Sequence, residues 1–153
     1  MTSTGLPFEG LLKSRRHVEM REQRLVAMLE RERLALEEHI RQLQRAIAAS
    51  RRAMRDALTG MVDAPMLRLH AFSITLQSQE QYRLSSVRAA LHERLGSARQ
   101  SLTEAARARR AIELMRERHS RRRRDLIVKT DAEALEELAI RAQSRGAVSG
   151  HSL

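Results

Sequence analysis

Cysteine is absent from this 153-residue sequence, and aromatic residues, glycine and proline are rare. Without cysteine the chain forms neither disulfides nor thiolate metal sites, which favours an intracellular protein. Three aromatic residues, Phe8, Phe72 and Tyr82, are too few to fill a thick globular core. The sequence therefore predicts one small domain with a thin core.

Long hydrophobic runs are missing as well. No stretch approaches the ~18 consecutive apolar residues of a transmembrane helix. The residues from Met1 to Gly5 lack the basic and apolar regions of a signal peptide. We therefore expect a soluble protein of the cytoplasm. Alanine, glutamate, leucine and arginine dominate the composition, and these residues lose little side-chain freedom in a helix.

The net charge of +10 is high for a chain of this size and is concentrated at its two ends. Residues 1–60 carry 12 basic against 8 acidic side chains, residues 61–106 carry 5 against 4, and residues 107–153 carry 12 against 7. Such a charge attracts nucleic acid, anionic lipid or an acidic protein surface. All but two of the basic residues are arginines, which genomic base composition explains as readily as phosphate binding does.

A first helix is predicted over about residues 6–58, because Pro7 suits a first helical turn and Glu9 complements the helix dipole. Apolar residues then recur with a coiled-coil spacing between charged ones. The heptad slips once, between Leu29 and Ile40, which predicts a stutter in the supercoil. The expected seam consists of Leu11, Val18, Leu25, Leu29, Leu36, Ile40, Leu43, Ile47 and Met54.

A turn is predicted over about residues 59–65, with Gly60 in a left-handed conformation and with Asp63 and Pro65 opening a second helix. That helix should span about residues 66–143. Residues 130–133 resemble a capping box, which would fit a kink. We expect residues 1–5 and 144–153 to be disordered. The expected seam consists of Leu69, Phe72, Leu76, Leu84, Val87, Leu91, Leu95, Ala98, Leu102, Ala105 and Ile112.

These elements predict an all-α fold, a long antiparallel two-helix coiled-coil hairpin whose second helix overhangs the first. About 50 helical residues span roughly 75 Å and about 77 span roughly 115 Å. A turn near Met61 would place Leu11 near Ile112 and Phe8 near Arg116. The two basic ends of the chain would then meet far from the turn.

Catalytic chemistry finds no support in the sequence. None of the six histidines has the helical spacing to a carboxylate that a metal site requires. A glycine-rich phosphate loop and a nucleophile elbow are also absent, and a two-helix hairpin has no substrate cavity. We therefore expect no enzymatic activity, no catalytic residue, no metal and no cofactor.

A dense cluster of arginines marks the second helix. It comprises Arg116, Arg118, Arg121, Arg122, Arg123 and Arg124, and it presents positive charge around most of the helix. The cluster is either a solvated segment, a docking site for an acidic protein surface, or a nucleic-acid contact. Aromatic residues for base stacking are absent from it, which disfavours single-stranded nucleic acid.

The turn end of the hairpin is predicted to be apolar on more than one face. Phe72 is expected in the seam, yet Met61, Met66, Leu67 and Ile74 surround it. Two helices cannot bury apolar residues on several faces, so a second docking site is predicted here. Its residues are Met66, Leu67, Phe72 and Ile74.

Three stretches resemble the FliJ family of flagellar export coiled-coil proteins, and the resemblance covers nearly the whole chain. The first is residues 8–16, with the sequence FEGLLKSRR, and the second is residues 110–118, RAIELMRER. The third combines Asp131 with residues 136–139, EELA. The length of the hairpin is also similar to that of the family.

The resemblance implies a stalk that inserts into the ring of a type III export ATPase, activates it, and couples it to the membrane export gate and to export chaperones. It also implies a location at the cytoplasmic side of the inner membrane, reached through these partners. The turn end would face the gate, and the open end would contact the ring. The implied ring contacts are Leu11, Leu12, Arg15, Arg16, Arg116, Arg118, Arg121, Arg122, Arg123 and Arg124.

Other functions remain open at this point. A basic coiled coil associated with nucleic acid would bind with strong salt dependence and without sequence preference. A structural scaffold would dimerise through exposed seam positions of the overhang. A stalk of the related injectisome secretion systems is a variant of the first hypothesis that this sequence does not separate from the flagellar one.

Overall fold

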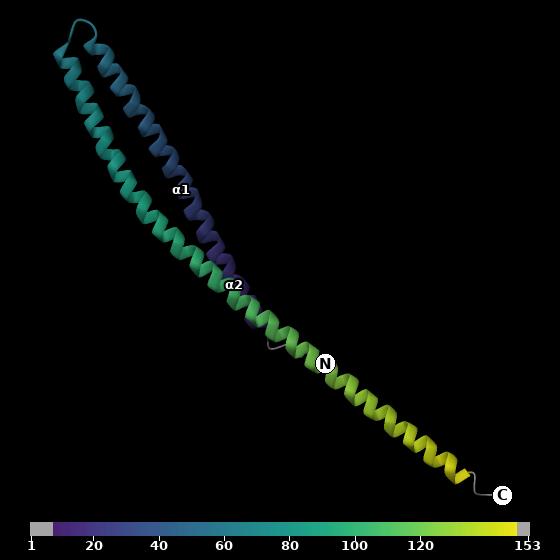
Figure 1. Cartoon of the computed structure of the whole chain (residues 1–153). Helices are drawn as coiled ribbons and strands as arrows, with labels where there is room; N and C mark the ends of the chain where they lie inside the picture. The colour runs from purple at the N-terminus through teal and green to yellow at the C-terminus, as the bar shows by residue number, and fades with distance from the viewer. Residues whose placement is uncertain (1–7, 150–153) are drawn as a thin grey trace. The chain divides into compact units, whose positions relative to one another are not determined.

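The computed structural model describes residues 8–149, which form two helices and, within that range, no strand. Helix α1 is Phe8–Leu58, with 51 residues, and helix α2 is Ala64–Ser149, with 86 residues (Figure 1). The two helices pack against each other as a helical hairpin, which confirms the predicted fold class. The predicted start of the first helix at residue 6 and the predicted disorder of residues 1–5 lie outside the described residues. Of the tail predicted to be disordered, residues 144–153, only 144–149 are described, and they are helical, so that part of the prediction is wrong. Helix α2 continues to Ser149, beyond the predicted end near residue 143.

The chain divides into two compact units. Residues Arg16–Ala106 form one unit, called the hairpin unit below, which contains most of α1, the turn and the first half of α2. The described residues of the other unit are 8–15 and 107–149, and it is called the terminal unit below.

A small apolar core holds the hairpin unit together. Leu29, Leu91, Leu95 and Ala98 form its centre, and both Leu29 and Leu95 are only 2% exposed. Each leucine removed from water in this way stabilises the fold by roughly 1.5–3 kcal/mol. The core is a single thin layer, as the scarcity of aromatic residues predicts. Val26 and Leu36 pack against its edge, and Ile40, Ile47 and Leu84 are also buried.

The seam of α1 repeats every seven residues without a stutter, so the predicted slip between Leu29 and Ile40 is wrong. The buried positions lie in two series that each advance by seven and include polar members. The sequence-based register followed apolar side chains and therefore chose Leu25, which is 38% exposed. One series consists of Glu19, Val26, Arg33, Ile40, Ile47 and Met54, and the other of Glu22, Leu29, Leu36, Leu43, Ser50 and Ala57, all at least half-buried. The flanking residues Val18, Glu30, Glu37, Glu38, Ala46 and Ala53 are also at least half-buried.

The seam of α2 is confirmed from Leu84 onward and wrong nearer the turn. Leu84, Leu91, Leu95, Ala98 and Ala105 are buried as predicted, although Val87 between them is 43% exposed. Nearer the turn, the inward positions of the same heptad repeat include the polar residues His70, Gln77 and Gln81. The predicted seam residues Leu69, Phe72 and Leu76 are therefore exposed, and the half-buried positions are Leu67, His70, Ile74, Gln77 and Gln81.

Polar side chains also pair across this part of the hairpin. The Ser50 hydroxyl donates to Gln77 Oε1 over 3.3 Å, which joins α1 to α2. Because both partners are satisfied, polar residues are tolerated at inward positions. The apolar residues of α2 that fall between these positions are left on the outer surface.

The turn is closed by threonine rather than by a left-handed glycine. No glycine within residues 8–149 has a positive φ, so the prediction for Gly60 is wrong. Instead, the Thr59 backbone N–H and hydroxyl both donate to the Asp56 carbonyl, over 3.2 Å and 2.7 Å. Helix α2 begins with the Asp63 carbonyl accepting the Leu67 N–H over 3.1 Å, and Pro65 lies in its first turn, as predicted.

Helix α2 runs without interruption through the predicted capping box. The Thr130 hydroxyl donates to the carbonyls of Leu126 and Ile127, over 3.1 Å and 2.9 Å. A cap would require the threonine oxygen to accept from a following N–H group. The side chain is instead bonded to the preceding turn, so the residues from 130 to 133 mark no helix boundary.

Candidate partner-binding surfaces

The first turns of α1 are anchored to α2 within the terminal unit. The Phe8 ring contacts the His119 ring edge-on, with centroids 5.6 Å apart. Glu9 Oε1 lies 3.6 Å from Arg116 Nη1, and Leu12 is only 3% exposed. Phe8 thus meets α2 nearly one helical turn beyond Arg116, its predicted neighbour. These contacts bring the start of α1 beside the start of the arginine cluster.

The other predicted ring-contact residues of α1 differ in their exposure. Leu11 is 50% exposed, whereas Leu12 points into the contact with α2 and serves to hold α1 in place. Arg15 is exposed in the terminal unit, and Arg16 is exposed in the hairpin unit. Leu11 and Arg15 are therefore available to a partner, and Leu12 is not.

Beyond Ser120, α2 continues with no other helix beside it in the terminal unit (Figure 1). Every residue from 121 to 146 is exposed. The four arginines at 121–124 open this segment, and among the described residues Arg118, Arg121, Arg122 and Arg123 form no ion pair. Arg124 donates from Nε to the Ser120 carbonyl over 3.4 Å. The positive charge of the cluster is therefore available to a partner on all sides of the helix.

An acidic segment follows on the same exposed part of α2, and the sequence-based prediction did not assign it a role. It consists of Asp131, Glu133, Glu136 and Glu137, with no lysine or arginine between them. Only Glu137 is paired within the described residues, with Arg141 Nη2 at 3.5 Å. The signal was present in the sequence as a group of four acidic residues that begins seven residues after Arg124.

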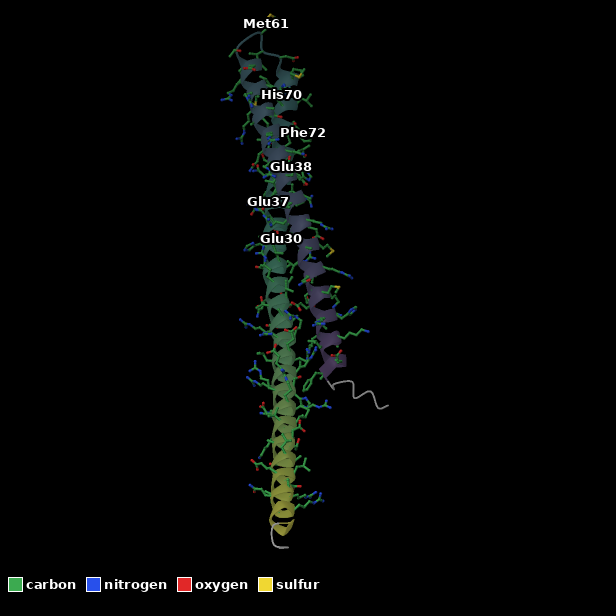
Figure 2. The ribbon with its side chains drawn as sticks, turned by 90° about the vertical axis from the view of Figure 1, so that its right-hand side faces the viewer. Glu30, Glu37, Glu38, Met61, His70 and Phe72 are labelled. Carbon is green, nitrogen blue, oxygen red and sulfur yellow. The ribbon has the colours of Figure 1, made fainter. Side chains whose placement is uncertain are left out.

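The turn end carries an exposed apolar stripe on α2. Leu69, Phe72 and Leu76 follow one another at spacings of three and four residues, which place them on one face of the helix, and they are 61%, 61% and 50% exposed. We call these three residues the turn-end stripe. Phe72 points outward near the end of the hairpin marked by Met61 (Figure 2).

The predicted turn-end residues are only partly gathered on that surface. Phe72 belongs to the stripe and Met66 is 45% exposed, whereas Leu67 and Ile74 lie half-buried at inward positions. Leu69 and Leu76 were missed as docking residues because they were assigned to the seam. An open groove lies on the last turns of α1, and its lining combines apolar and basic side chains: Ala48, Arg51, Arg52, Met54, Arg55 and Leu58.

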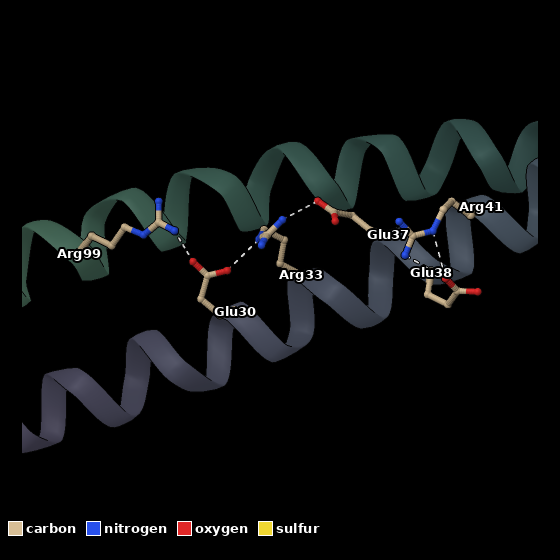
Figure 3. A network of polar contacts seen from close by, with 6 residues as sticks. All are labelled: Glu30, Arg33, Glu37, Glu38, Arg41 and Arg99. Atoms are coloured by element: carbon tan, nitrogen blue, oxygen red, sulfur yellow. Dashed lines mark hydrogen bonds and ion pairs between the residues drawn. The ribbon is translucent and has the colours of Figure 1, made fainter.

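Charged residues near the middle of the hairpin unit are already committed to one another (Figure 3). Arg33 donates from Nε to Glu30 and from Nη1 to Glu37, both over 2.8 Å, and Arg99 of α2 also donates to Glu30. The hydrogen bonds from Arg33 and then from Arg99 lower the pKa of the Glu30 carboxyl below its ordinary value. This network joins α1 to α2 and leaves little charge for a partner.

No group of three or more histidine, aspartate or glutamate side chains within the described part of the chain is arranged to hold a metal ion. Neither described helix has an apolar stretch that is long enough to cross a membrane. Comparison with known proteins finds no matching family, no matching curated protein and no matching solved structure.

Proposed function

We propose that this protein is a FliJ-type component of flagellar protein export, the central stalk that inserts into and activates the ring of the type III export ATPase. The observation that supports it best is the exposed arginine cluster of α2, beside which the first turns of α1 are anchored by Leu12 and Phe8. A helical end of this kind is slender and strongly basic. It therefore suits insertion into a narrow ring with acidic side chains.

The ring contact would be mainly electrostatic. The available residues are Leu11 and Arg15 of α1, and Arg118 and the arginines at 121–124 of α2, all of which are exposed. Exposed charges contribute less to affinity than to the orientation and rate of association. Reversing them should therefore slow engagement of the ring and make it more sensitive to salt.

The turn-end stripe would serve the second contact, with the export gate membrane protein. Leu69, Phe72 and Leu76 are apolar, exposed and on one helical face, the arrangement with which a helix docks into a hydrophobic groove. Export chaperones are further proposed partners. The protein would then lie at the cytoplasmic side of the inner membrane through its partners rather than through a membrane-inserted segment of its own.

The test is the ATPase rate of the cognate export ATPase, measured with and without this protein. The wild-type chain should stimulate the rate, and the R121E/R122E/R123E variant should lose most of that stimulation at unchanged helicity. The matched control is R51E/R52E/R55E, which reverses three exposed arginines of α1 that form no ion pair among the described residues. Full stimulation by the cluster variant would overturn the proposal.

A parallel titration with double-stranded DNA addresses the alternative function, because the same cluster could contact phosphates. DNA affinity that falls steeply with salt, combined with no effect on the ATPase, would favour a nucleic-acid-associated protein. Stimulation without appreciable DNA binding would favour the stalk. Repeating both assays with an injectisome ATPase separates the flagellar system from its variant.

A further inference from the structure

The turn of the hairpin unit is apolar where a turn is normally polar. Met61, which marks the end of the hairpin in Figure 2, is 101% exposed, and Leu58, Val62 and Met66 around it are 53%, 58% and 45% exposed. We call these four residues the turn tip. Exposed turns are usually built from glycine, proline, asparagine, aspartate or serine. Packing within the hairpin unit does not account for apolar side chains at these positions.

Arginines flank the turn tip on both helices. Arg51 and Arg55 of α1 lie four residues apart on the face that carries Leu58, and Arg52 lines the same open groove. Arg68 lies in the first turns of α2, beside the turn-end stripe. All four arginines are exposed, and among the described residues they form no ion pair.

The charge of this end of the hairpin is strongly one-sided. Between Glu38 and Glu80 the sequence has six arginines and only two acidic residues, Asp56 and Asp63. Asp56 directly follows Arg55 and therefore lies on another side of α1. Asp63 directly precedes α2, whose N-terminal dipole favours a negative charge there. The four exposed arginines therefore keep their positive charge available.

We propose that the turn tip contacts an anionic lipid surface, with its apolar side chains in the headgroup region and the four arginines at the lipid phosphates. Arg51 and Arg55 precede the end of α1 by seven and three residues, and Arg68 follows the start of α2 by four. When the hairpin stands upright on the surface, these arginines lie about 4–11 Å behind the helix ends. Apolar groups of surface-bound helices enter the boundary of headgroups and acyl chains by about 5–10 Å, so the arginines reach the level of the phosphates.

Other occupants match less of this surface. A second copy would bring the arginines of two turns together, and like charges disfavour that contact. Nucleic acid would pair with the arginines but would leave Met61 and Val62 in water. A protein groove would cover one side of the turn, whereas the apolar side chains lie on both helices and on the loop between them. A lipid surface is fluid and covers the whole tip at once.

The arginine cluster of α2 is a competing site for anionic lipid, because exposed apolar residues follow it. Val128 and Leu135 lie seven residues apart on one face of the helix and are 68% and 67% exposed. The polar face of that segment carries Glu133, Glu136 and Glu137, whereas helices that bind anionic membranes carry basic residues there. We therefore assign the lipid contact to the turn tip and use the other segment as the control.

This inference goes beyond the proposed function and does not depend on it. The proposed function brings the protein to the membrane through its partners, and the turn tip adds a direct contact with lipid to them. Phe72 and Leu76 lie farther from the turn than Arg68, so they stay outside the lipid and open to the export gate.

The first test is co-sedimentation of the full chain with vesicles of phosphatidylcholine alone or mixed with phosphatidylglycerol. The wild type should bind the anionic vesicles at least about tenfold more tightly, and salt should reduce this preference. M61S/V62S keeps the net charge and should weaken that binding at least about fivefold, because two apolar side chains no longer enter the interface. The matched control V128S/L135S removes two exposed apolar residues of the competing site and should change the affinity by less than about twofold.

The arginines are tested with two variants of equal net charge. R51E/R52E/R55E should lose the preference for anionic vesicles, whereas R121E/R122E/R123E should keep most of it. Because both variants reverse three exposed arginines, a difference between them reports the position of the charge and not its total. Circular dichroism should show unchanged helicity in both.

A second test uses the absence of tryptophan in the wild type. The fluorescence of M61W should shift to shorter wavelength on addition of anionic vesicles, and brominated lipids should quench it. V128W is the matched control, and its emission should not change. The reverse result would assign the lipid contact to the exposed segment of α2.

Three results would overturn the inference. One is a wild type that binds neither kind of vesicle, and another is binding of M61S/V62S as tight as that of the wild type. The third is loss of vesicle binding in R121E/R122E/R123E combined with wild-type binding by R51E/R52E/R55E. The ATPase assay of the proposed function contains no lipid, so failure of the lipid contact and failure of the stalk proposal are distinguishable.

Discussion

The middle of the hairpin unit and residues 121–146 of α2 are both helical, leucine-containing and rich in charge, yet they use these residues in opposite ways. In the hairpin, Leu29 and Leu95 are 2% exposed, whereas Leu135 and Leu138 are 67% and 60% exposed. Apolar spacing alone therefore does not distinguish a core from a surface. A neighbouring helix is needed to turn an apolar stripe into a core.

The charged residues of these two regions also differ, because those of the hairpin unit are paired and most of those in residues 121–146 are not. Glu30 of the hairpin unit is held by Arg33 and Arg99, while Asp131, Glu133 and Glu136 of the terminal unit make no ion pair among the described residues. The hairpin uses its charges to join its helices. In residues 121–146 the arginines at 121–123 and these three acidic residues are separated along the helix, and water solvates them.

Leu29→Asp should produce the largest effect. A carboxylate at a position that is 2% exposed loses the apolar contacts and buries a charge, which costs at least about 3–5 kcal/mol. The thin core leaves little stability in reserve. Circular dichroism should show loss of most of the helicity at room temperature. The control is Leu34→Asp, because Leu34 is 55% exposed on the same helix and its replacement should leave the helicity unchanged.

Gly96→Ala should stabilise the hairpin. A Cβ atom at Gly96 would meet no other atom within 4 Å, and the glycine has no positive φ. Alanine is favoured over glycine inside a helix by roughly 0.5–1 kcal/mol. We expect a rise of the melting temperature by about 2–5 °C. Gly146→Ala places a methyl group in equally open space but near the end of α2, and it should leave the melting of the hairpin unit unchanged.

The ion-pair network should make the hairpin less stable in acid. The pKa of Glu30 is lowered in the folded protein, mainly by Arg33, so its contribution is complete above the ordinary value of 4.5 and is lost as the pH falls below it. Glu30→Gln should reduce the fall in melting temperature between about pH 6 and about pH 3. Glu93→Gln removes a carboxylate without an ion pair among the described residues and should leave that fall unchanged. Equal behaviour of the two variants would show that the network does not stabilise the hairpin.

Leu135→Asp should have the smallest effect on stability. Because Leu135 is 67% exposed, the free energy of unfolding should change by less than about 0.5 kcal/mol. Thermal melting followed by circular dichroism measures this effect. A large loss of melting temperature would mean that this segment is packed against the chain itself.

Much of the fold follows from the sequence, and the errors of the sequence-based prediction share one cause. The two helices, the turn near residue 60 and the position of Pro65 in the first turn of α2 were predictable from local signals. The stutter, the inward position of Phe72 and the left-handed Gly60 were wrong. The seam was assumed to follow apolar residues, whereas Glu22 and Arg33 occupy inward positions of α1 and His70 and Gln77 occupy those of α2. Long polar side chains can lie along a thin seam with their charged or polar ends in solvent.

The candidate surfaces were predictable in part. The arginines at 121–124 were recognised because a run of one charge is a local feature of the sequence. Leu69 and Leu76 were not recognised, because their exposure depends on which face of α2 meets α1. Leu12 was assigned to a partner for the same reason, although it is buried against α2.

The sequence by itself determined the all-α class, the two long helices and the uneven distribution of charge. Helix formation and charge depend on residues near one another in the chain. Only the tertiary structure decided the register of the seam, the outward direction of the turn-end stripe and the anchoring of Phe8 beside His119. These features depend on residues far apart in the chain. The observed register joins Ser50 to Gln77 and Glu30 to Arg99, pairs that no local pattern reveals.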